Sequence, residues 1–262
     1  MNFLDFASFA TPTRELPAVA DGRAIDFPLG SELRVASKQS ARFGDGGDFF
    51  EVFEHASRTV STVVADVCGN GAAAAKVAAR IRPFLHHSLA RGESPGRVLA
   101  ALNEALVDEG FDEGLDEGFD EGFDDRFVTA VAVRVDVQTG LVEIACAGHL
   151  GPFVRRSSGR VHAIERATGV PLGLVPGERY EEIKVRLEPE DALVLVTDGI
   201  TDPLSSADDP LGEAAFALLL EHAPRVTLDL CEMLLLDGAP SRDDATVLVL
   251  QLPARAATPI AA

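Results

Sequence analysis

Tryptophan is absent from this sequence of 262 residues, and there is a single tyrosine. Proteins that hold single-stranded nucleic acid generally stack its bases on aromatic side chains, which this composition hardly supplies. Basic residues are also few, since 23 lysines and arginines stand against 42 acidic residues and the net charge is −19. The sequence shows no local run of basic residues, and a surface of this charge repels phosphate backbones. We therefore expect no nucleic-acid partner.

Cysteine is scarce as well, and the three cysteines, Cys68, Cys146 and Cys231, form no C-x-x-C pair. This usage predicts reduced thiols in a cytoplasmic protein. The first 20 residues include Asp5 and lack the positively flanked apolar stretch of a signal peptide. No apolar run approaches the ~18 residues that a membrane span requires. We expect a cytoplasmic protein with no membrane association.

The length suits one large domain with a sizeable core. Residues 1–30 are mixed in composition and include three prolines, so we predict a loosely ordered N-terminal lead-in there. We place the domain at residues 31–252 and a frayed C-terminal tail at residues 253–262. Between 108 and 125, Asp-Glu-Gly followed by Phe or Leu occurs four times in tandem. A solvated acidic loop is the simpler interpretation, and a cation-binding or partner-docking arm is the alternative.

Hydrophobic periodicity divides the rest of the chain into strands and helices. Strands are predicted near 33–37, 49–53, 60–66, 127–137, 141–147, 152–156, 161–164, 180–187, 192–197 and 245–250. Helices are predicted at 72–91, 95–106, 211–222 and 226–236. The helices come in pairs separated by runs of strands and hairpins, so the pattern indicates an α+β layered sandwich and not a parallel doubly wound sheet.

Aspartates lie at the ends of the most apolar predicted strands. The run from Val60 ends at Asp66, and Gly69 and Gly71 follow it. The run 192–197 leads directly into Asp198, and the pair Asp243-Asp244 precedes the last strand. Carboxylates held at strand ends beside glycine turns are suited to binding hard divalent cations. Taken singly, each of these aspartates could equally be a turn former or a helix cap.

Seven short motifs follow one another along the chain. They are Gly-Gly47-Asp48, Asp66-x-x-Gly69-x-Gly71, Phe127-x-Thr129, Ala147-Gly148-His149, Gly169-x-Pro-Leu-Gly173, Thr197-Asp198-Gly199 and Asp243-Asp244-x-Thr246. In this order and spacing the series resembles the metal-dependent protein phosphatases of the type 2C class. It is most similar to the bacterial branch that contains the sporulation stage II E phosphatase and the stress-response partner-switching phosphatases. The resemblance covers residues 33–252.

The resemblance implies a four-layer αββα sandwich, in which two antiparallel sheets are flanked by helix pairs. It implies two Mn²⁺ or Mg²⁺ ions and hydrolysis of phosphoserine or phosphothreonine by metal-activated water. By the same resemblance, the substrate is an anti-sigma-factor antagonist or a similar regulatory protein. The metal ligands would be the side chains of Asp66, Asp198 and Asp243 and the backbone carbonyl of Val67. Asp48 joins the three aspartates as a catalytic residue, acting through metal-bound water.

Several assignments stay open at this level. Only one of Asp243 and Asp244 need bind metal, and the resemblance selects Asp243. Thr129 and His149 match supporting positions, although a histidine at 149 could also be a general acid for the leaving group. A small buried filler is the simpler interpretation of Cys68. Where many type 2C relatives carry Gly-Asp-Ser-Arg, this chain has Ala-Gly148-His149, which leaves a third metal site open.

Three other functions are compatible with parts of the sequence. The chain could be a catalytically weak pseudophosphatase that acts as a binding module, although retention of all three metal aspartates argues against this. It could hydrolyse a small phosphorylated metabolite with the same residues. It could also be an acidic interaction protein whose activity lies in the repeat at 108–123.

Overall fold

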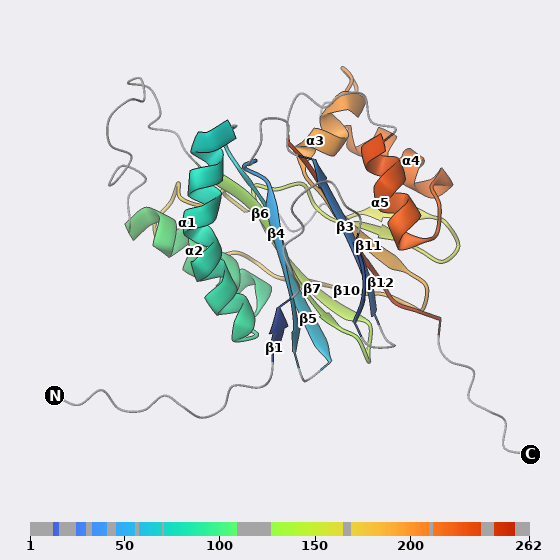
Figure 1. Ribbon diagram of the computed structural model, residues 1–262, viewed down its shortest axis with the longest axis horizontal. Helices are drawn as coiled ribbons and strands as arrows, with labels where there is room; N and C mark the ends of the chain where they lie inside the picture. Colours follow the sequence, from blue (N-terminus) through green and yellow to red (C-terminus); the bar gives the residue numbers. More distant parts are fainter. Residues whose placement is uncertain are drawn as a thin grey trace, which may run out of the picture.

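The computed structural model describes residues 13–15, 25–29, 33–40, 46–55, 58–69, 71–108, 127–164, 169–209, 212–236 and 244–254. Within them, two six-stranded sheets lie face to face, with helices on both outer surfaces (Figure 1). The strand pairings within both sheets are antiparallel. The predicted α+β class and the four-layer αββα architecture are therefore confirmed.

We refer to the two sheets as sheet A and sheet B. Sheet A contains, in spatial order, β1 (Thr13–Glu15), β4 (Phe49–His55), β5 (Thr59–Val67), β6 (Val128–Asp136), β7 (Leu141–Ala147) and β10 (Ile183–Arg186). Sheet B contains β2 (Ile25–Leu29), β3 (Leu33–Ser40), β12 (Ala245–Gln251), β11 (Ala192–Val196), β8 (Phe153–Arg155) and β9 (Val161–Ala163). The hairpins predicted for β6–β7 and β8–β9 are both present.

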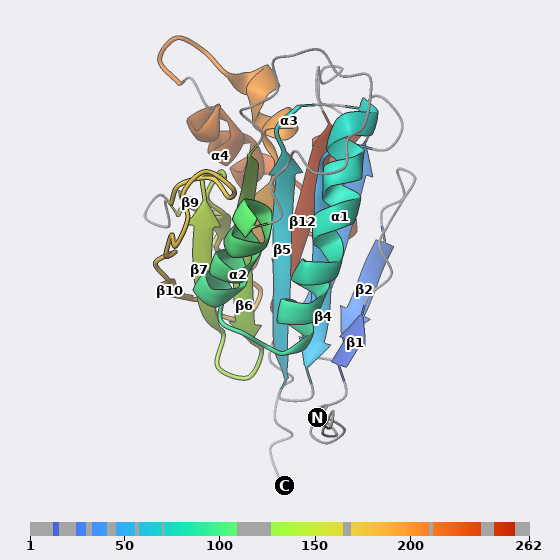
Figure 2. The same cartoon turned by 90° about the vertical axis from the view of Figure 1, so that its left-hand side faces the viewer.

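One helix pair covers each sheet. Sheet A is covered by α1 (Gly71–Ala90) and α2 (Pro95–Asp108), which lie across β4 to β7 in Figure 2. Sheet B is covered by α4 (Glu213–His222) and α5 (Thr227–Leu236). A short helix α3 (Asp198–Thr201) and a 3₁₀ turn η1 (Asp202–Leu204) follow β11 directly.

The apolar core forms three layers because both faces of each sheet are covered. In β5, Val60 and Val64 face the space between the sheets, whereas Val63 and Ala65 face α1 and α2. Side chains alternate between the two faces of a strand, so a strand buried on both faces reads as a continuous apolar run. The third layer lies between sheet B and its helices, with Phe216 at its centre.

Within residues 1–30, where the sequence predicted a loosely ordered lead-in, the structure describes two short strands. β1 pairs with β4 at one edge of sheet A, and β2 pairs with β3 at one edge of sheet B. Pro28 lies inside β2, opposite Arg34. Proline is tolerated on an edge strand because one side of that strand needs no ladder hydrogen bonds. Pro28 is therefore compatible with its place in an edge strand.

Other expectations lie wholly or partly outside the described residues. These are the acidic repeat after Asp108, the C-terminal tail from residue 255, and Asp243. None of the three cysteines, all of which the structure describes, is in a disulfide bond, and Cys146 and Cys231 are buried. Across the parts of the chain that the structure describes, none of the helices combines the length and apolarity of a membrane span.

Candidate metal centre

The candidate site lies at the end of the sandwich where β5 and β11 finish and β4 and β12 begin. In Figure 2, β5 points towards α3 at this end. Alternation along β4 and β5 explains which side chains meet there. Phe50 and Val64 face the space between the sheets, so Asp48 and Asp66, two residues away on each strand, face the same space. Two carboxylates from neighbouring strands therefore point between the sheets.

Asp48 is the most enclosed of these carboxylates, with 4 % of its surface exposed. Its Oδ2 accepts a 2.6 Å hydrogen bond from Thr197 Oγ1, which comes from the other sheet. Burial raises the pKa of Asp48 well above its ordinary value, and the charges of Asp66 and Asp244 raise it further. The hydroxyls of Thr197 and Thr246 oppose this by lowering the pKa. The site therefore concentrates negative charge that a bound cation would stabilise.

Thr197 fixes the relative positions of the three strands around Asp48. Its backbone N–H donates to the carbonyl of Thr246 at 3.1 Å, and its Oγ1 accepts from the Thr246 N–H at 2.9 Å. Both threonines are fully buried. The Thr246 hydroxyl also lowers the pKa of Asp48, although its Oγ1 makes no hydrogen bond of ordinary geometry with the described residues. The single Thr197 hydroxyl thus ties β11, β12 and the start of β4 together.

Asp244 links the segment before β4 to the start of β12. Its Oδ2 accepts the Gly47 N–H at 2.8 Å, and the residue is 4 % exposed. A Cβ at Gly46 would lie 2.4 Å from this same oxygen, and a Cβ at Gly199 would lie 1.9 Å from the Asp244 carbonyl. Glycine is favoured at Gly46 because the Asp244 carboxylate packs against it, and at Gly199 because the backbone of Asp244 approaches so closely. Asp244 therefore holds the glycine turn before Asp48, while its neighbour Asp243 lies outside the described residues.

The end of β5 presents Asp66 and the Val67 carbonyl. Asp66 is half-buried and lies opposite Thr129 of β6. A Cβ on Gly47 would come within 3.0 Å of the Val67 carbonyl oxygen, so only glycine leaves that oxygen clear. Gly69 and Gly71 then take positive φ values of 103° and 64°, which turn the chain from the strand into α1. The predicted sequence of strand, aspartate, turn and helix is present.

Asp198 is the first residue of α3 and is exposed to solvent. It follows Thr197 directly, so its backbone is fixed by the hydrogen bonds that Thr197 makes to β12 and Asp48. The tight approach of Gly199 to the Asp244 carbonyl fixes the next residue as well. An exposed carboxylate on a backbone fixed at the end of β11 is well placed to bind a ligand.

His149 connects the two sheets beside Asp66. Its Nδ1 lies 2.8 Å from Thr129 Oγ1, and its Nε2 lies 3.2 Å from the Val196 carbonyl. A carbonyl accepts only, so Nε2 carries the proton and Nδ1 accepts from the Thr129 hydroxyl. Part of the residue reaches the surface, but the ring is enclosed, and burial lowers its pKa to about 4 against the effect of the Val196 hydrogen bond. With both nitrogens engaged, the geometry favours a positioning residue over a general acid.

The donors at this end fit a hard divalent cation. Carboxylates and a backbone carbonyl are oxygen donors, which Mg²⁺ and Mn²⁺ prefer. In the described segments no three His, Cys, Asp or Glu side chains form a cluster that could hold an ion alone. The predicted ligand set is not limited to such a cluster, because it includes the Val67 carbonyl and Asp243. Gly47 supports the fit, because a side chain there would crowd the Val67 carbonyl oxygen.

Comparisons with known proteins place this geometry in a recognised fold. The curated protein IcfG of Synechocystis sp. is 22 % identical over 230 residues, which are 78 % of this chain and 35 % of IcfG. This chain therefore spans about a third of that relative. The solved RsbU and RsbW domains of a Mycobacterium tuberculosis protein are 22 % identical, with a TM-score of 0.72 over 91 % of this chain and 65 % of the other. The SiaA-PP2C domain of Pseudomonas aeruginosa is 23 % identical, with a TM-score of 0.67 over 83 % of this chain and 85 % of the other.

Two further structures of this fold were solved with divalent metals. RsbX in complex with magnesium has a TM-score of 0.65 at 16 % identity, over 88 % of this chain and all of that one. The catalytic domain of the serine/threonine phosphatase PstP with two manganese ions has a TM-score of 0.56 at 19 % identity, over 85 % and 99 %. At these identities the likeness establishes the fold of the type 2C phosphatases. The model of the stage II sporulation protein E (SpoIIE) family matches residues 56–253, well over half of the sequence. The chain belongs to the SpoIIE family.

Proposed function

We propose that this protein is a metal-dependent serine/threonine protein phosphatase that uses water as the nucleophile. The observation that carries the proposal is the convergence of Asp48, Asp66 and the Thr197-Asp198 turn at one end of a type 2C fold. Membership of the SpoIIE family and the similarity to the catalytic domain of PstP support it.

The residues that would hold two Mn²⁺ or Mg²⁺ ions are Asp66, the Val67 carbonyl, Asp198 and Asp243. The complexes of RsbX with magnesium and PstP with two manganese ions support this choice of metals. Such ions, when bound, lower the pKa of water and stabilise negative charge on phosphoryl oxygens. Oxygen ligands without cysteine or histidine favour these metals over zinc.

The surrounding residues would act by holding the catalytic carboxylates in fixed positions. Asp66 is held between Thr129 and the Asp48 region by strand register, and the neutral His149 fixes the Thr129 hydroxyl. Thr197 orients Asp48 through the hydrogen bond that its hydroxyl donates to Oδ2. Since the carboxylates of Asp48 and Asp66 are held by rigid strands, little reorganisation would be needed when a phosphate group binds.

Membership of the SpoIIE family supports a proposal for the substrate class. We infer a phosphorylated regulatory protein, such as an anti-sigma-factor antagonist, as the substrate. The fold match to RsbU and RsbW domains within one chain supports a role in partner switching. Cysteines without disulfide bonds agree with a cytoplasmic location, which we also propose.

The test is phosphate release from a phosphoserine protein, a phosphothreonine peptide and a panel of small phosphate esters, each with manganese, magnesium or neither. Metal-dependent turnover that is fastest on the phosphoprotein supports the proposal. Faster turnover of one small ester would show a metabolite phosphatase. If no substrate turns over with either metal, the protein is a pseudophosphatase.

A further inference from the structure

A second site lies at the far end of sheet B, away from the carboxylates. A pocket of about 190 Å³ opens there between the outer face of sheet B, the β8–β9 hairpin and the start of α5. Strand register places both Arg34 of β3 and Ala192 of β11 opposite Gln251 of β12. Thr246 and Thr197 lie five residues farther along β12 and β11, so roughly 17 Å separates the pocket from the candidate metal centre.

Arginines dominate the polar lining of this pocket. Arg34, Arg155, Arg156 and Arg225 all line it, and Glu190 is the one carboxylate that does. These residues are far apart in the sequence, so the fold creates a basic cluster that the sequence order does not show. The chain as a whole has a net charge of −19, whereas four arginines and one carboxylate line this pocket. The cluster therefore points to an anionic ligand.

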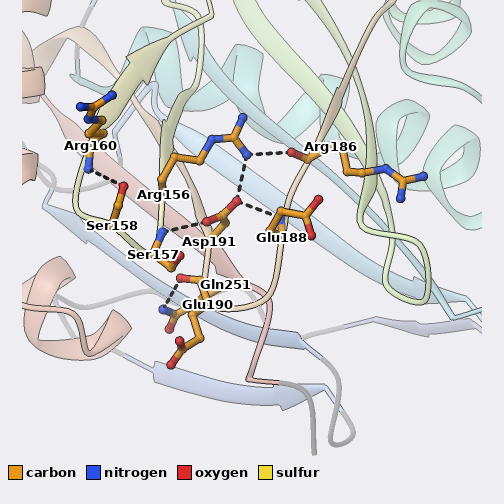
Figure 3. Close-up of polar contacts among 9 residues, drawn as sticks. All are labelled: Arg156, Ser157, Ser158, Arg160, Arg186, Glu188, Glu190, Asp191 and Gln251. Atoms are coloured by element: carbon orange, nitrogen blue, oxygen red, sulfur yellow. Dashed lines mark hydrogen bonds and ion pairs between the residues drawn. The ribbon is translucent and has the colours of Figure 1, made fainter.

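The nearby Asp191 cannot neutralise the cluster because its oxygens are already engaged. Figure 3 shows its carboxylate between Arg156 and the backbone of Ser157 and Glu188. Arg156 donates to it at 2.9 Å, and the N–H groups of Ser157 and Glu188 donate at 2.8 Å each. Asp191 is buried and compensates Arg156. The charges of Arg34, Arg155 and Arg225 are left to the pocket.

Those three arginines form no ion pair with any residue in the described ranges. Arg155 is 7 % exposed, and its two terminal nitrogens donate to the carbonyls of Ala223 and Pro224. Arg225 donates to the Ser157 carbonyl at 2.6 Å. Burial and the charge of Arg225 both lower the pKa of Arg155. The buried cation of Arg155 and the exposed cation of Arg225 thus repel each other, and an anion bound beside them would relieve the repulsion.

The N-terminus of α5 also favours a negatively charged ligand. Thr227 is the first residue of the helix, is 3 % exposed and lines the pocket. N–H groups in the first turn of a helix have no intrahelical acceptor and favour anions. The floor is apolar, with Leu230 and Val249. This combination of guanidinium groups, helix N–H groups and an apolar floor resembles a small-molecule site more than a crevice between elements.

We propose that this pocket binds the phosphate group of a small molecule. The volume of about 190 Å³ exceeds the roughly 30 Å³ of a water molecule and falls below the roughly 300 Å³ of drug-sized ligand sites. Arginines from three separate parts of the chain line this volume: β3, the β8–β9 hairpin and the segment before α5. That arrangement suits a tetrahedral dianion, because guanidinium groups form paired hydrogen bonds with phosphate oxygens.

The experiment is calorimetric titration of orthophosphate into the full chain at constant ionic strength. The protein is first passed over a chelating resin, so that divalent ions do not support phosphate binding at the carboxylates. Saturable binding is expected, and Arg34→Gln and Arg225→Gln should each weaken it about tenfold. Both side chains are exposed, and neither substitution removes a core contact. Arg160→Gln is the matched control, since Arg160 is an exposed arginine of the same hairpin that does not line the pocket.

Equal affinity in the wild type and the Arg34→Gln/Arg225→Gln double variant would overturn the proposal, as would the absence of saturable binding. Glycerol phosphate, titrated in parallel, identifies the source of the phosphate group. Tighter binding of the ester than of orthophosphate would assign the site to a phosphate monoester, and the reverse order would assign it to free phosphate. Either order of affinities supports the site, provided that binding is lost in the double variant and retained in Arg160→Gln.

Discussion

Thr197 Oγ1 donates a 2.6 Å hydrogen bond to Asp48 Oδ2, although 149 residues separate the two in the sequence. The bond crosses from sheet B to sheet A at the end of the sandwich where the candidate metal ligands lie. It orients a carboxylate whose pKa is raised by burial and by two neighbouring carboxylates. The hydroxyl therefore offsets part of the cost of building an acidic site inside the fold.

Thr197→Val should destabilise the protein and weaken metal binding together. Valine has nearly the same shape but leaves the Thr246 N–H and Asp48 without their partner. We expect a loss of about 1–3 kcal/mol in the free energy of unfolding and a fall of about 10- to 100-fold in Mn²⁺ affinity by calorimetry. Thr62→Val is the control, because Thr62 is equally buried and donates to the Glu51 carbonyl away from the site. An unchanged Mn²⁺ affinity in Thr197→Val would contradict the assigned role.

The His149 imidazole should stay neutral through the physiological pH range. Its pKa in the folded protein, about 4, lies below the ordinary value of 6.5, so the unfolded chain binds the proton more tightly between these values. Stability should therefore rise as pH increases from about 4 to about 6.5. Nitrogen-15 NMR of the ring should show the Nε2–H tautomer and no titration near pH 6.5. A midpoint near 6.5 would instead indicate a histidine free to act as a general acid.

Gly47→Ala should impair metal binding through the Val67 carbonyl. The new methyl would lie 3.0 Å from that oxygen and 2.9 Å from the Ala74 Cβ, so one of them must move. The expected cost is about 1–3 kcal/mol of stability, accompanied by weaker Mn²⁺ binding. Gly177→Ala is a matched comparison, since its φ of 71° costs about 1–2 kcal/mol while nothing lies within 4 Å of the added methyl. Equal Mn²⁺ affinities in the two variants would argue against Val67 as a ligand.

Glu143 should contribute a pH-dependent part of the stability. Burial raises its pKa, but Lys184 and Arg134 outweigh that effect, and the pKa lies below the ordinary value of 4.5. Its contribution is then present above pH 4.5 and is lost as pH falls through the lower folded value. Glu143→Gln should cost about 1–2 kcal/mol at pH 7 and much less near pH 3, measured by urea unfolding. The exposed Glu181→Gln should change little at either pH.

Much of the fold could be predicted because local patterns determine it. The continuous apolar runs at 60–66 and 192–197 indicated strands covered on both faces, and the structure confirms them as β5 and β11. Ser94 and Pro95 indicated the start of α2, and the Ser94 carbonyl accepts the first helical N–H groups. β1 and β2 were missed because their stability comes from pairing with β4 and β3, which local propensity does not reveal.

The site was only partly predictable. Its aspartates stood out because each follows or precedes an apolar strand, but Thr197, Thr246 and Asp244 received no structural role. Their contacts reach across 149 or more residues or between strands, so spacing in the sequence gave no sign of them. The alternation of side chains along a strand was an available signal. Asp244 and Thr246 lie an even number of positions before Leu248, so they lie on the same face as Leu248, which faces the space between the sheets. The arginine pocket was missed for a similar reason, since its members come from residues 34, 155–156 and 225.

The most direct test of the account compares Asp198→Asn with Asp202→Asn in manganese-dependent hydrolysis of a phosphoserine protein. Both aspartates are exposed and lie four residues apart, but only Asp198 is a proposed ligand. We predict that Asp198→Asn lowers turnover at least about 100-fold while remaining folded, and that Asp202→Asn stays near wild type. Wild-type turnover in Asp198→Asn would contradict the proposed metal centre.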